Sequence, residues 1–438
     1  MKYLLKNGFL LKPGRTDFER SDILFNGSSI NKIGTGIEVD GDTLIIDLKN
    51  KIIVPGLIDV HVHLRQPGQT YKESIFSGSR AAAAGGFTTV IAEPNTRPPI
   101  DSVSRLKSVI KIAEKRSLVN FYTKACISKK MGGEKLADIQ GLKNAGAVAI
   151  TDDGHPVPGE ELMKQALIAG RKYDILVDPH CEESEMYRQN IMRSNGGLFP
   201  NSIMPYSNSK NEPYSSETGF IKRDIELAKT IGARIHISHV SLATSVEEIR
   251  KAKKAGVQVT AEATPHHLLL SKKDESLGTN AKVNPPLRTE EDVSAVKEGV
   301  IDGTIDIIAT DHAPHSVAEK AQPWDRAPFG IIGLETSLGL MITFLVKPGL
   351  LTINQLVERM SLKPATIYRL PIHKISVDEK ANLTVIDPDE KWIVNADNFY
   401  SKGRNCPFNG WELQGRAIMT IVNGQIVMKD RKILEDNN

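Results

Sequence analysis

Cysteine and unbalanced charge are the first two things that this sequence lacks. Only three cysteines occur, at Cys126, Cys181 and Cys406, and they are far apart. An odd number without a Cys-x-x-Cys pair excludes a disulfide framework, so we interpret each as a small apolar residue rather than a metal ligand. The 56 basic and 53 acidic side chains leave a net charge of only +3. That balance gives no electrostatic signature of nucleic acid or of an anionic membrane.

Long apolar segments are also missing. No stretch approaches the ~18 uninterrupted apolar residues of a membrane span. The first residues, MKYLLKNGFLLKPG, lack both the apolar region and the cleavage site of a signal peptide. We therefore expect a cytoplasmic protein that acts on a small molecule. With 438 residues, the chain has room for one barrel-sized domain and a small second domain.

The middle of the chain alternates between strand-like and helix-like patterns. The apolar, strand-like runs are LIDVHVHL, TTVIAEPN, VNFYTKAC, AVAITDD, ILVDPH, RIHISHV, VQVTAEA and IDIIATDH. Stretches rich in Ala, Lys, Glu and Leu separate them, among them residues 74–86, 103–116, 160–173 and 246–256. Glycines lie where such helices would end, at Gly86, Gly146, Gly232 and Gly256. Eight such units predict an α/β fold in which residues 55–370 form a (β/α)₈ TIM-like barrel.

Both ends of the chain carry short β-like runs separated by turn residues. The first end contains KYLLKNGFLL, DILFNGSSINKIG and TLIIDLKNKIIV, in which Asn7-Gly8, Asn26-Gly27 and Gly41-Asp42 suit tight hairpins. The other end contains ANLTVIDP, KWIVNA and AIMTIVNGQIVMKD. Neither end has enough strands for a core of its own. We therefore predict one small β-sandwich domain built from residues 1–54 and 371–438.

Imidazole and carboxylate side chains follow the predicted strands. His61 and His63 share one face of the first strand, because side chains at i and i+2 point the same way. Neutral imidazole and carboxylate are ligands of Zn²⁺ and similar divalent ions, and a carboxylate that bridges two ions suits two-metal hydrolysis. We predict a metal pair whose ligands are His61, His63, Asp153, His180, His239 and Asp311.

The two aspartates of this set have different predicted roles. The TDDG segment could be a simple Asp-Gly turn, but an acid after the fourth strand is needed to link two ions, and we choose Asp153 over Asp152. His180 and His239 would then hold the second ion. Asp311 follows the eighth strand, where it could hold one ion and also take and return the proton of the attacking water.

Other polar residues nearby receive supporting roles. Asp59 shares the strand face of His61 and is expected to orient an imidazole. His236, inside the sixth strand, is interpreted as structural, and the adjacent His266 and His267 are left out of the metal site.

A second group of residues could hold a substrate. Arg65 lies two residues beyond His63 and offers a fork of donors suited to a carboxylate, although it could also be a surface salt-bridge residue. Asn95 and Asn284 add neutral hydrogen bonding, and His315 is a candidate substrate contact. A metal-activated water beside an arginine and asparagines that could bind a carboxylate implies that the substrate is a small anionic amide. These residues do not identify which one.

The motifs together resemble one known family. DVHVHLRQPG, EPNT, TDDG, PHCEE, HISHVS, AEATPHHLLL, KVNPPLR, ATDHAPH, PFGIIGLE and SKGRNCPFNGWELQG are similar to the bacterial dihydroorotases of the long-chain type, within the amidohydrolase superfamily. The resemblance spans nearly the whole chain. It implies reversible cyclisation of N-carbamoyl-L-aspartate to (S)-dihydroorotate, the third step of pyrimidine synthesis, with two Zn²⁺ ions per chain, or other divalent ions, and a bridging hydroxide.

The resemblance also implies a role for each site residue. His61, His63 and Asp311 would hold the first zinc, His180 and His239 the second, and Asp153 would bridge them. Asp311 would be the general acid and base. The substrate would be contacted by His63, Arg65, Asn95, Asn284, His315 and the backbone near Phe329 and Gly330. Many superfamily members bridge their metals with a carbamylated lysine, but the fourth strand offers Asp153 and no lysine here.

Two departures and two alternatives accompany this interpretation. Gln66 stands where the motif usually has an acid. Residues 204–217 form a longer, more polar stretch than in the family, which suggests a solvated insertion, or else a role in subunit contact or in covering the site. The alternatives are a related hydantoinase or allantoinase, and a non-catalytic dihydroorotase-like partner of aspartate transcarbamoylase. A homodimer, with possible binding to that transcarbamoylase, is the expected assembly.

Overall fold

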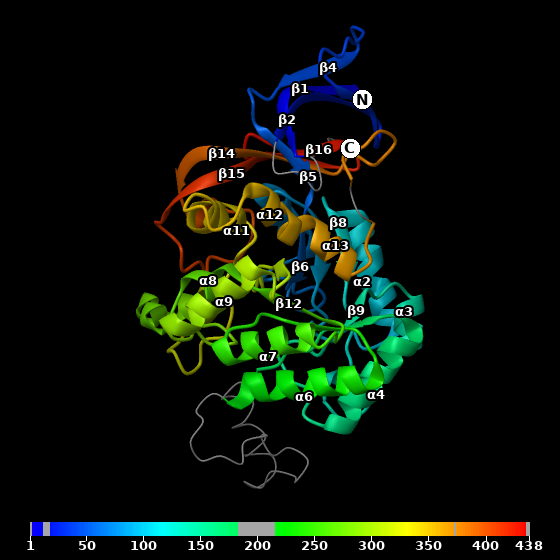
Figure 1. Ribbon diagram of the computed structural model, residues 1–438, viewed down its shortest axis with the longest axis vertical. Coiled ribbons are helices and arrows are strands. Elements are labelled where there is room, and N and C mark those ends of the chain that lie inside the picture. The colour runs from blue at the N-terminus through cyan, green and yellow to red at the C-terminus, as the bar shows by residue number, and fades with distance from the viewer. Residues whose placement is uncertain (1, 12–17, 183–214, 372–373, 435–438) are drawn as a thin grey trace.

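The computed structural model describes residues 2–11, 18–182, 215–371 and 374–434 (Figure 1). Most of the polar stretch at 204–217 lies outside these ranges. Within them, no helix is long and apolar enough to cross a membrane. Figure 1 shows the strands of the two chain ends, with both termini, at one end of the molecule, and helices α4, α6 and α7 at the other.

Eight parallel strands form the predicted barrel. They occur in two sheets, β6-β7-β8 and β13-β12-β11-β10-β9. Parallel bridges from Ala125 to Ile150 and from Val62 to His312 join the sheets and close the ring. Each strand overlaps a run predicted from the sequence. The strands are β6 (Leu57–Val62), β7 (Phe87–Ala92), β8 (Asn120–Thr123), β9 (Ala149–Ile150), β10 (Leu176–Val177), β11 (Ile235–Ile237), β12 (Val259–Ala263) and β13 (Ile307–Ile308).

Helices surround the barrel between these strands. They are α1 (Ile75–Gly85), α2 (Val103–Arg116), α3 (Ile139–Asn144), α4 (Glu160–Tyr173), α6 (Ser215–Ile231), α7 (Ala243–Lys254), α8 (Pro265–Leu269), α9 (Glu290–Asp302), α10 (Val317–Lys320), α11 (Ser337–Met341), α12 (Ile353–Val357) and α13 (Lys363–Ile367). In α2, the buried residues Leu106, Val109 and Ala113 form one stripe at helical spacing. Gly86 ends α1 with φ of 93°, a conformation that glycine adopts without strain.

The two chain ends form one sheet of their own, which confirms the predicted β-domain. Its order is β17-β16-β15-β14-β5-β1-β2-β3, with β4 paired to β1. Residues 371–438 join residues 1–54 where β14 runs antiparallel to β5, with Thr384 opposite Val54. The strands are β1 (Lys2–Leu11), β2 (Phe18–Asn26), β3 (Ser29–Gly34), β4 (Thr43–Asp47), β5 (Ile52–Pro55), β14 (Leu383–Ile393), β15 (Glu412–Val422), β16 (Gln425–Lys429) and β17 (Lys432–Ile433). The exact domain boundaries stay a proposal.

Two of the predicted hairpins are wrong and one is confirmed. Asn26-Gly27 connects the antiparallel strands β2 and β3 as expected. Asn7-Gly8 instead lies inside the continuous strand β1, where the pairing register to β2 shifts. The physical reason is a bulge, because Asn7 has φ of 57° and its N–H donates to Asp22 Oδ1 at 2.9 Å rather than closing a turn. Gly41-Asp42 precedes β4, which pairs with β1 in parallel and so is not half of a hairpin.

Candidate active site

The six predicted ligands lie at the C-terminal ends of the barrel strands. His61 is in β6 and His63 follows it directly, so the two imidazoles point to the same side. The other four follow β9, β10, β11 and β13, in the order Asp153, His180, His239 and Asp311. None of the six residues is more than 7% exposed. The barrel therefore gathers ligands that are far apart in sequence into one buried cluster.

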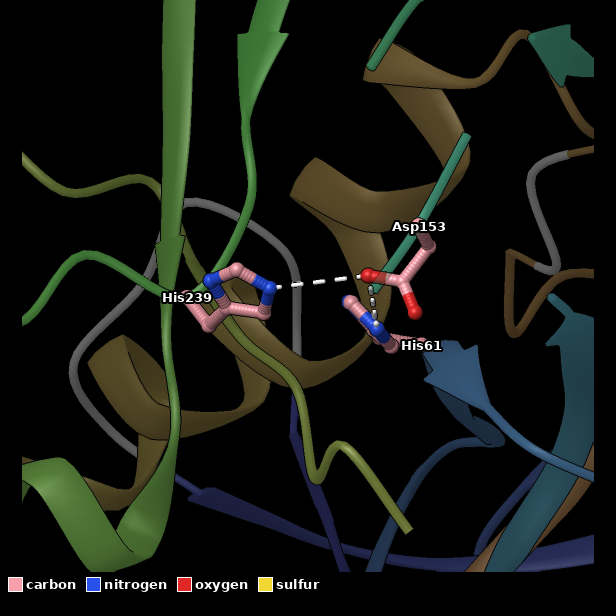
Figure 2. A group of neighbouring side chains, drawn as sticks. All are labelled: His61, Asp153 and His239. Atoms are coloured by element: carbon pink, nitrogen blue, oxygen red, sulfur yellow. Dashed lines mark ion pairs between the residues drawn. The ribbon is translucent and has the colours of Figure 1, made fainter. Parts of the chain in front are cut away.

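Asp153 lies at the centre of this cluster (Figure 2). Its Oδ1 is 3.4 Å from His61 Nε2 and 3.5 Å from His239 Nε2. His180 Nδ1 is also 3.5 Å from that oxygen. The other oxygen, Oδ2, is 3.5 Å from His63 Nε2. One carboxylate thus faces four imidazoles with its two oxygens turned to different partners, as a bridging ligand requires.

Asp311 closes the cluster on the side of His63. Its Oδ1 lies 2.9 Å from His63 Nε2 and 3.7 Å from His61 Nε2. Asp311 and His239 both have a left-handed backbone, with φ of 47° and 31°. Residues other than glycine rarely adopt this conformation, and such strain is concentrated at functional sites. The fold therefore holds these two side chains in place against a local backbone preference.

The ligand atoms fit a divalent metal ion. His61 Nε2 and Asp153 Oδ1 are buried, face each other, and have no hydrogen-bond partner among the described residues. Two groups have ligand atoms within 4.8 Å of one another: His61 with Asp153 and His239, and His61 with His63 and Asp311. Nitrogen and carboxylate donors of this kind suit zinc and similar ions. The second group matches the set predicted for the first zinc, while the division of ligands between two ions stays a prediction.

Electrostatic interactions hold the two carboxylates in their charged form. Burial raises the pKa of Asp153, but the neighbouring His61, His180 and His239 outweigh it and keep that pKa well below its usual range. Burial also raises the pKa of Asp311, but the hydrogen bond with His63 and the charges of His61, His63 and His239 together outweigh burial and lower that pKa below its usual range. Both side chains are therefore carboxylates at neutral pH, the form that binds a metal and accepts a proton.

A layer of buried charges lies beneath the ligands and was missed in the sequence. Glu262, in β12, is 2.6 Å from His61 Nδ1 and leaves Nε2 of that ring facing Asp153. Lys124 Nζ is 2.5 Å from Glu93 Oε1 and also pairs with Asp178. One feature of the sequence could have revealed this layer. Glu262 lies inside the apolar strand VTAEA, and a carboxylate that is buried there needs a hydrogen-bonding or charged partner.

Asp59 does not orient an imidazole, contrary to the prediction. Its Oδ1 accepts the backbone N–H groups of His61 at 3.1 Å and Thr310 at 3.2 Å, and Glu262 holds the His61 ring instead. A strand rises ~3.3 Å per residue, so a carboxylate two residues earlier lies too deep in the barrel to reach the ring. Burial raises the pKa of Asp59 to about 7.

Two of the three histidines that were kept out of the metal site, His236 and His267, have other partners. His236 Nδ1 lies 2.8 Å from Thr260 Oγ1. His267 Nδ1 is 2.9 Å from Thr264 Oγ1, and its Nε2 is 2.9 Å from the carbonyl of Pro285. Burial lowers the pKa of the neighbouring His266 well below its usual value.

Arg65 and His315 form a second cluster at the rim. Arg65 Nε donates to the carbonyl of Pro314 at 3.2 Å, and Nη2 lies 3.2 Å from His315 Nε2. No carboxylate of the described residues lies within ion-pair distance of Arg65. Burial lowers the pKa of Arg65 to about 10, so the guanidinium remains charged at neutral pH. A partly buried cation without a carboxylate partner suits a substrate that carries one.

Hydrogen bonds identify the tautomer of His315. Nε2 lies 2.8 Å from the carbonyl of Phe329, which can only accept, and Nδ1 lies 3.3 Å from Lys72 Nζ, which can only donate. These two contacts favour the neutral ring with its proton on Nε2, and Arg65 Nη2, which can only donate, then makes no hydrogen bond to that nitrogen although it lies 3.2 Å away. Burial, Arg65 and Lys72 lower the pKa of His315 to about 2, in agreement with a neutral ring.

The two predicted substrate-binding asparagines contact ligand residues. Asn95 Oδ1 is 2.9 Å from His63 Nδ1, and its amide nitrogen donates to Asp153 Oδ2 at 3.1 Å. Asn284 Nδ2 lies 3.0 Å from His180 Nε2. Both side chains thus hold ligands in position, and their contacts to a substrate stay predictions, as do those of Phe329 and Gly330. The Gly330 N–H already donates to the carbonyl of Lys282 at 2.9 Å.

Known proteins resemble this chain along its length. A family model described as Dihydro-orotase-like matches residues 50–245. A dihydroorotase of Caldanaerobacter subterraneus subsp. tengcongensis is 43% identical over 438 residues, covering 99% of each chain. A dihydroorotase of Syntrophus aciditrophicus is 42% identical over 98% of this chain and 100% of that protein. Among solved structures, an L-hydantoinase (dihydropyrimidinase) from Arthrobacter aurescens has a TM-score of 0.86 at 27% identity, covering 99% of this chain and 97% of that one.

Proposed function

The chain belongs to the dihydroorotase family, and we propose that it is a metal-dependent dihydroorotase. The reaction is the reversible cyclisation of N-carbamoyl-L-aspartate to (S)-dihydroorotate and water, the third step of pyrimidine synthesis. One observation supports this proposal above the others. The Asp153 carboxylate faces the imidazoles of His61, His63, His180 and His239 at 3.4–3.5 Å in a buried site.

Two divalent ions, which we propose to be zinc, would polarise the amide carbonyl and activate a water molecule when bound there. Asp311, beside His63, is placed to accept the proton of that water as its oxygen bonds to the ring carbonyl carbon. The same carboxyl group would return the proton to the ring nitrogen as the carbon–nitrogen bond breaks. Ring closure reverses these steps and releases water.

The rim cluster would bind the rest of the substrate. The Arg65 guanidinium, which has no carboxylate partner among the described residues, would pair with the substrate carboxylate through two parallel hydrogen bonds. His315 would remain neutral and supply a hydrogen bond rather than charge, in line with its low pKa. The residues that bind the substrate carboxylate would thus be separate from those that hold the metals.

Further features of the assembly are proposals from the sequence. They are a homodimer, association with aspartate transcarbamoylase, and a cytoplasmic location. A non-catalytic partner role is disfavoured because all six ligand residues are present and gathered at one point.

Substrate choice and metal content test the proposed function. The purified protein should convert dihydroorotate, in preference to hydantoin and allantoin, and should contain close to two divalent ions per chain. Turnover of hydantoin alone would assign the chain to the hydantoinase type of reaction instead. A protein without metal and without turnover would be a non-catalytic relative.

Replacing the bridging carboxylate tests its assignment. Asp153→Ala should lower both metal content and activity, because three imidazoles then lose the oxygen that they share. Asp138→Ala is the matched control, since Asp138 is an exposed helix cap remote from the cluster. Metal content can be measured by atomic emission on dialysed protein. Full occupancy of two ions in Asp153→Ala would remove Asp153 from the bridge.

A further inference from the structure

A segment of the C-terminal part of the chain returns to the rim of the barrel. Residues 401–405, here called the strap, connect β14 to β15. Ser401 Oγ donates to the buried Glu73 carboxylate at 2.5 Å, and the backbone N–H of Lys402 also approaches that carboxylate, at 3.3 Å. Lys402 Nζ donates to the carbonyl of Thr70 at 2.7 Å. The strap is therefore anchored to the loop before α1 at its first two residues.

The last residue of the strap, Asn405, binds two separate segments of the rim. Its amide nitrogen donates to the carbonyls of Ala313 and Gly330, both at 3.0 Å. Its amide oxygen accepts the backbone N–H of His315 at 3.2 Å, and its own carbonyl accepts the N–H of Ile332 at 3.0 Å. The side chain is only 2% exposed. All hydrogen-bonding groups of this buried amide except one lone pair are thus used between the two segments.

The two segments that Asn405 joins are in direct contact. Ala313 N–H donates to the carbonyl of Ile331 at 2.7 Å. Gly330 has φ of 128°, and a Cβ at this position would lie 2.7 Å from the Cβ of Ala313, so only glycine permits this approach. The hydrogen bond from His315 Nε2 to Phe329 closes the same contact on the side of the site.

We propose that Asn405 is a positioning residue that sets the relative placement of His315 and the Phe329–Gly330 backbone for substrate binding. The proposal rests on the proposed function, since these groups are its predicted substrate contacts. Lys320 supports the same arrangement, because its Nζ donates to the carbonyls of Pro328 and Gly330 at 3.0 Å. The terminal part of the chain then contributes to the site by holding loops rather than by touching substrate.

Two substitutions separate the donor and acceptor functions of this amide. Asn405→Asp has the same shape and keeps an acceptor for the His315 N–H, but it places an oxygen against two carbonyl oxygens. Asn405→Ala removes every side-chain bond without adding charge, and it gives the same readout should the Asp variant fail to fold. Asn409→Ala is the control, because Asn409 follows the strap closely but bonds only locally, accepting the N–H of Ala396 at 2.9 Å.

The measurements are kcat and KM for dihydroorotate, metal content, and melting temperature. Displaced substrate contacts should weaken substrate binding and raise KM for both Asn405 variants by about 10-fold or more, and the misplaced substrate should lower kcat as well, but by less. Metal content should equal that of the parent, since Asn405 contacts no ligand. The control should keep the parent KM.

Two outcomes would overturn the proposal in distinguishable ways. If the parent enzyme turns over dihydroorotate and the Asn405 variants lose only melting temperature, with KM within twofold of Asn409→Ala, then Asn405 is merely structural. Loss of metal together with a raised KM would also show that Asn405 is merely structural. If the parent itself does not act on dihydroorotate, the proposed function fails first and this inference fails with it.

Discussion

The interior of the barrel and the core of the sheet formed by the two chain ends, here called the terminal sheet, bury different kinds of side chain. The core of the terminal sheet is mainly apolar, with Leu5, Phe25 and Ile53 fully buried among similar side chains. The barrel buries just as completely a layer of ionisable groups under the ligands, namely Asp59, Glu93, Lys124, Asp178 and Glu262. One region is optimised for burial of apolar surface, and the other keeps charge where water cannot reach it.

This difference shows where function opposes stability. Removing charges from water costs several kcal/mol per ion unless hydrogen bonds and opposite charges compensate. Burial raises the pKa of Glu93 to about 8 even though Lys124 lies 2.5 Å away. The buried charges under the ligands therefore do not serve stability alone. Their position explains them, because Glu262 in this layer holds the His61 ring. The apolar sheet has no such task.

The largest expected effect comes from changing charge at the ligand layer without changing shape. Asp311→Asn should lower kcat by at least about 10³-fold, since general acid–base catalysis contributes ~10²–10⁴-fold and metal activation is altered as well. KM should change much less. Steady-state assay with dihydroorotate gives both constants. The free energy of unfolding should change little in comparison.

Asp306→Asn is the matched control for that experiment. Asp306 lies at the other end of strand β13, where it accepts from Lys253 Nζ at 2.6 Å and from Ala261 N–H at 3.0 Å. Its variant should keep parental turnover per folded molecule. An Asp311→Asn enzyme with near-parental kcat would show that Asp311 does not carry the proton.

The second effect comes from the core of the terminal sheet, where a substitution should greatly lower stability without lowering turnover. Phe25 is fully buried in the terminal sheet and stacks on Tyr3 at 5.2 Å between ring centroids. Phe25→Ala should lower the free energy of unfolding by ~3–5 kcal/mol, the usual range for a buried phenylalanine. Urea unfolding followed by circular dichroism measures this change. Turnover per folded molecule should stay that of the parent.

Leu44→Ala provides the comparison within the same sheet. Leu44 is 50% exposed on β4, so its truncation should change stability by well under 1 kcal/mol. If Phe25→Ala abolished turnover while the protein remained folded, the terminal sheet would influence the site much more strongly than its apolar core indicates.

The same contrast explains what could be predicted from the sequence. Apolar runs alternate with helical stretches along the barrel, so eight strands were recognisable, and strand topology then gathers His61, Asp153 and Asp311 at one rim. The short β-like runs of both chain ends likewise predicted one small β-domain. These features depend on local patterns and on a general rule of chain topology.

Contacts between distant residues could not be predicted in this way. Glu262 lies 201 residues from the ring that it holds, and Asn405 lies 75 residues from the Gly330 carbonyl that it binds. The Asn7-Gly8 pair also has the composition of a hairpin turn, and only its bond to Asp22 makes it a bulge. In each case the deciding interaction joins segments that no local pattern relates.

The smallest expected effect separates substrate grip from metal chemistry at Arg65. A planar guanidinium can pair with a carboxylate through two parallel hydrogen bonds, which a lysine ammonium cannot reproduce. Arg65→Lys should also lose the bond from Nε to the Pro314 carbonyl and the contact with His315. We expect KM for dihydroorotate to rise by about 10–100-fold, with a smaller fall in kcat from misplacement of the ring. Metal content should equal that of the parent, because Arg65 is not among the ligands.

A neutral analogue without the carboxylate sharpens this test. Parent and Arg65→Lys enzymes should treat that analogue alike, since the missing carboxylate is the group that Arg65 would bind. Arg250→Lys, on the exposed face of α7, controls for the exchange of arginine for lysine itself. Should Arg65→Lys lose metal, or discriminate against the neutral analogue as strongly as against dihydroorotate, Arg65 would be a structural residue of the rim. The separation of substrate binding from metal chemistry would then be wrong.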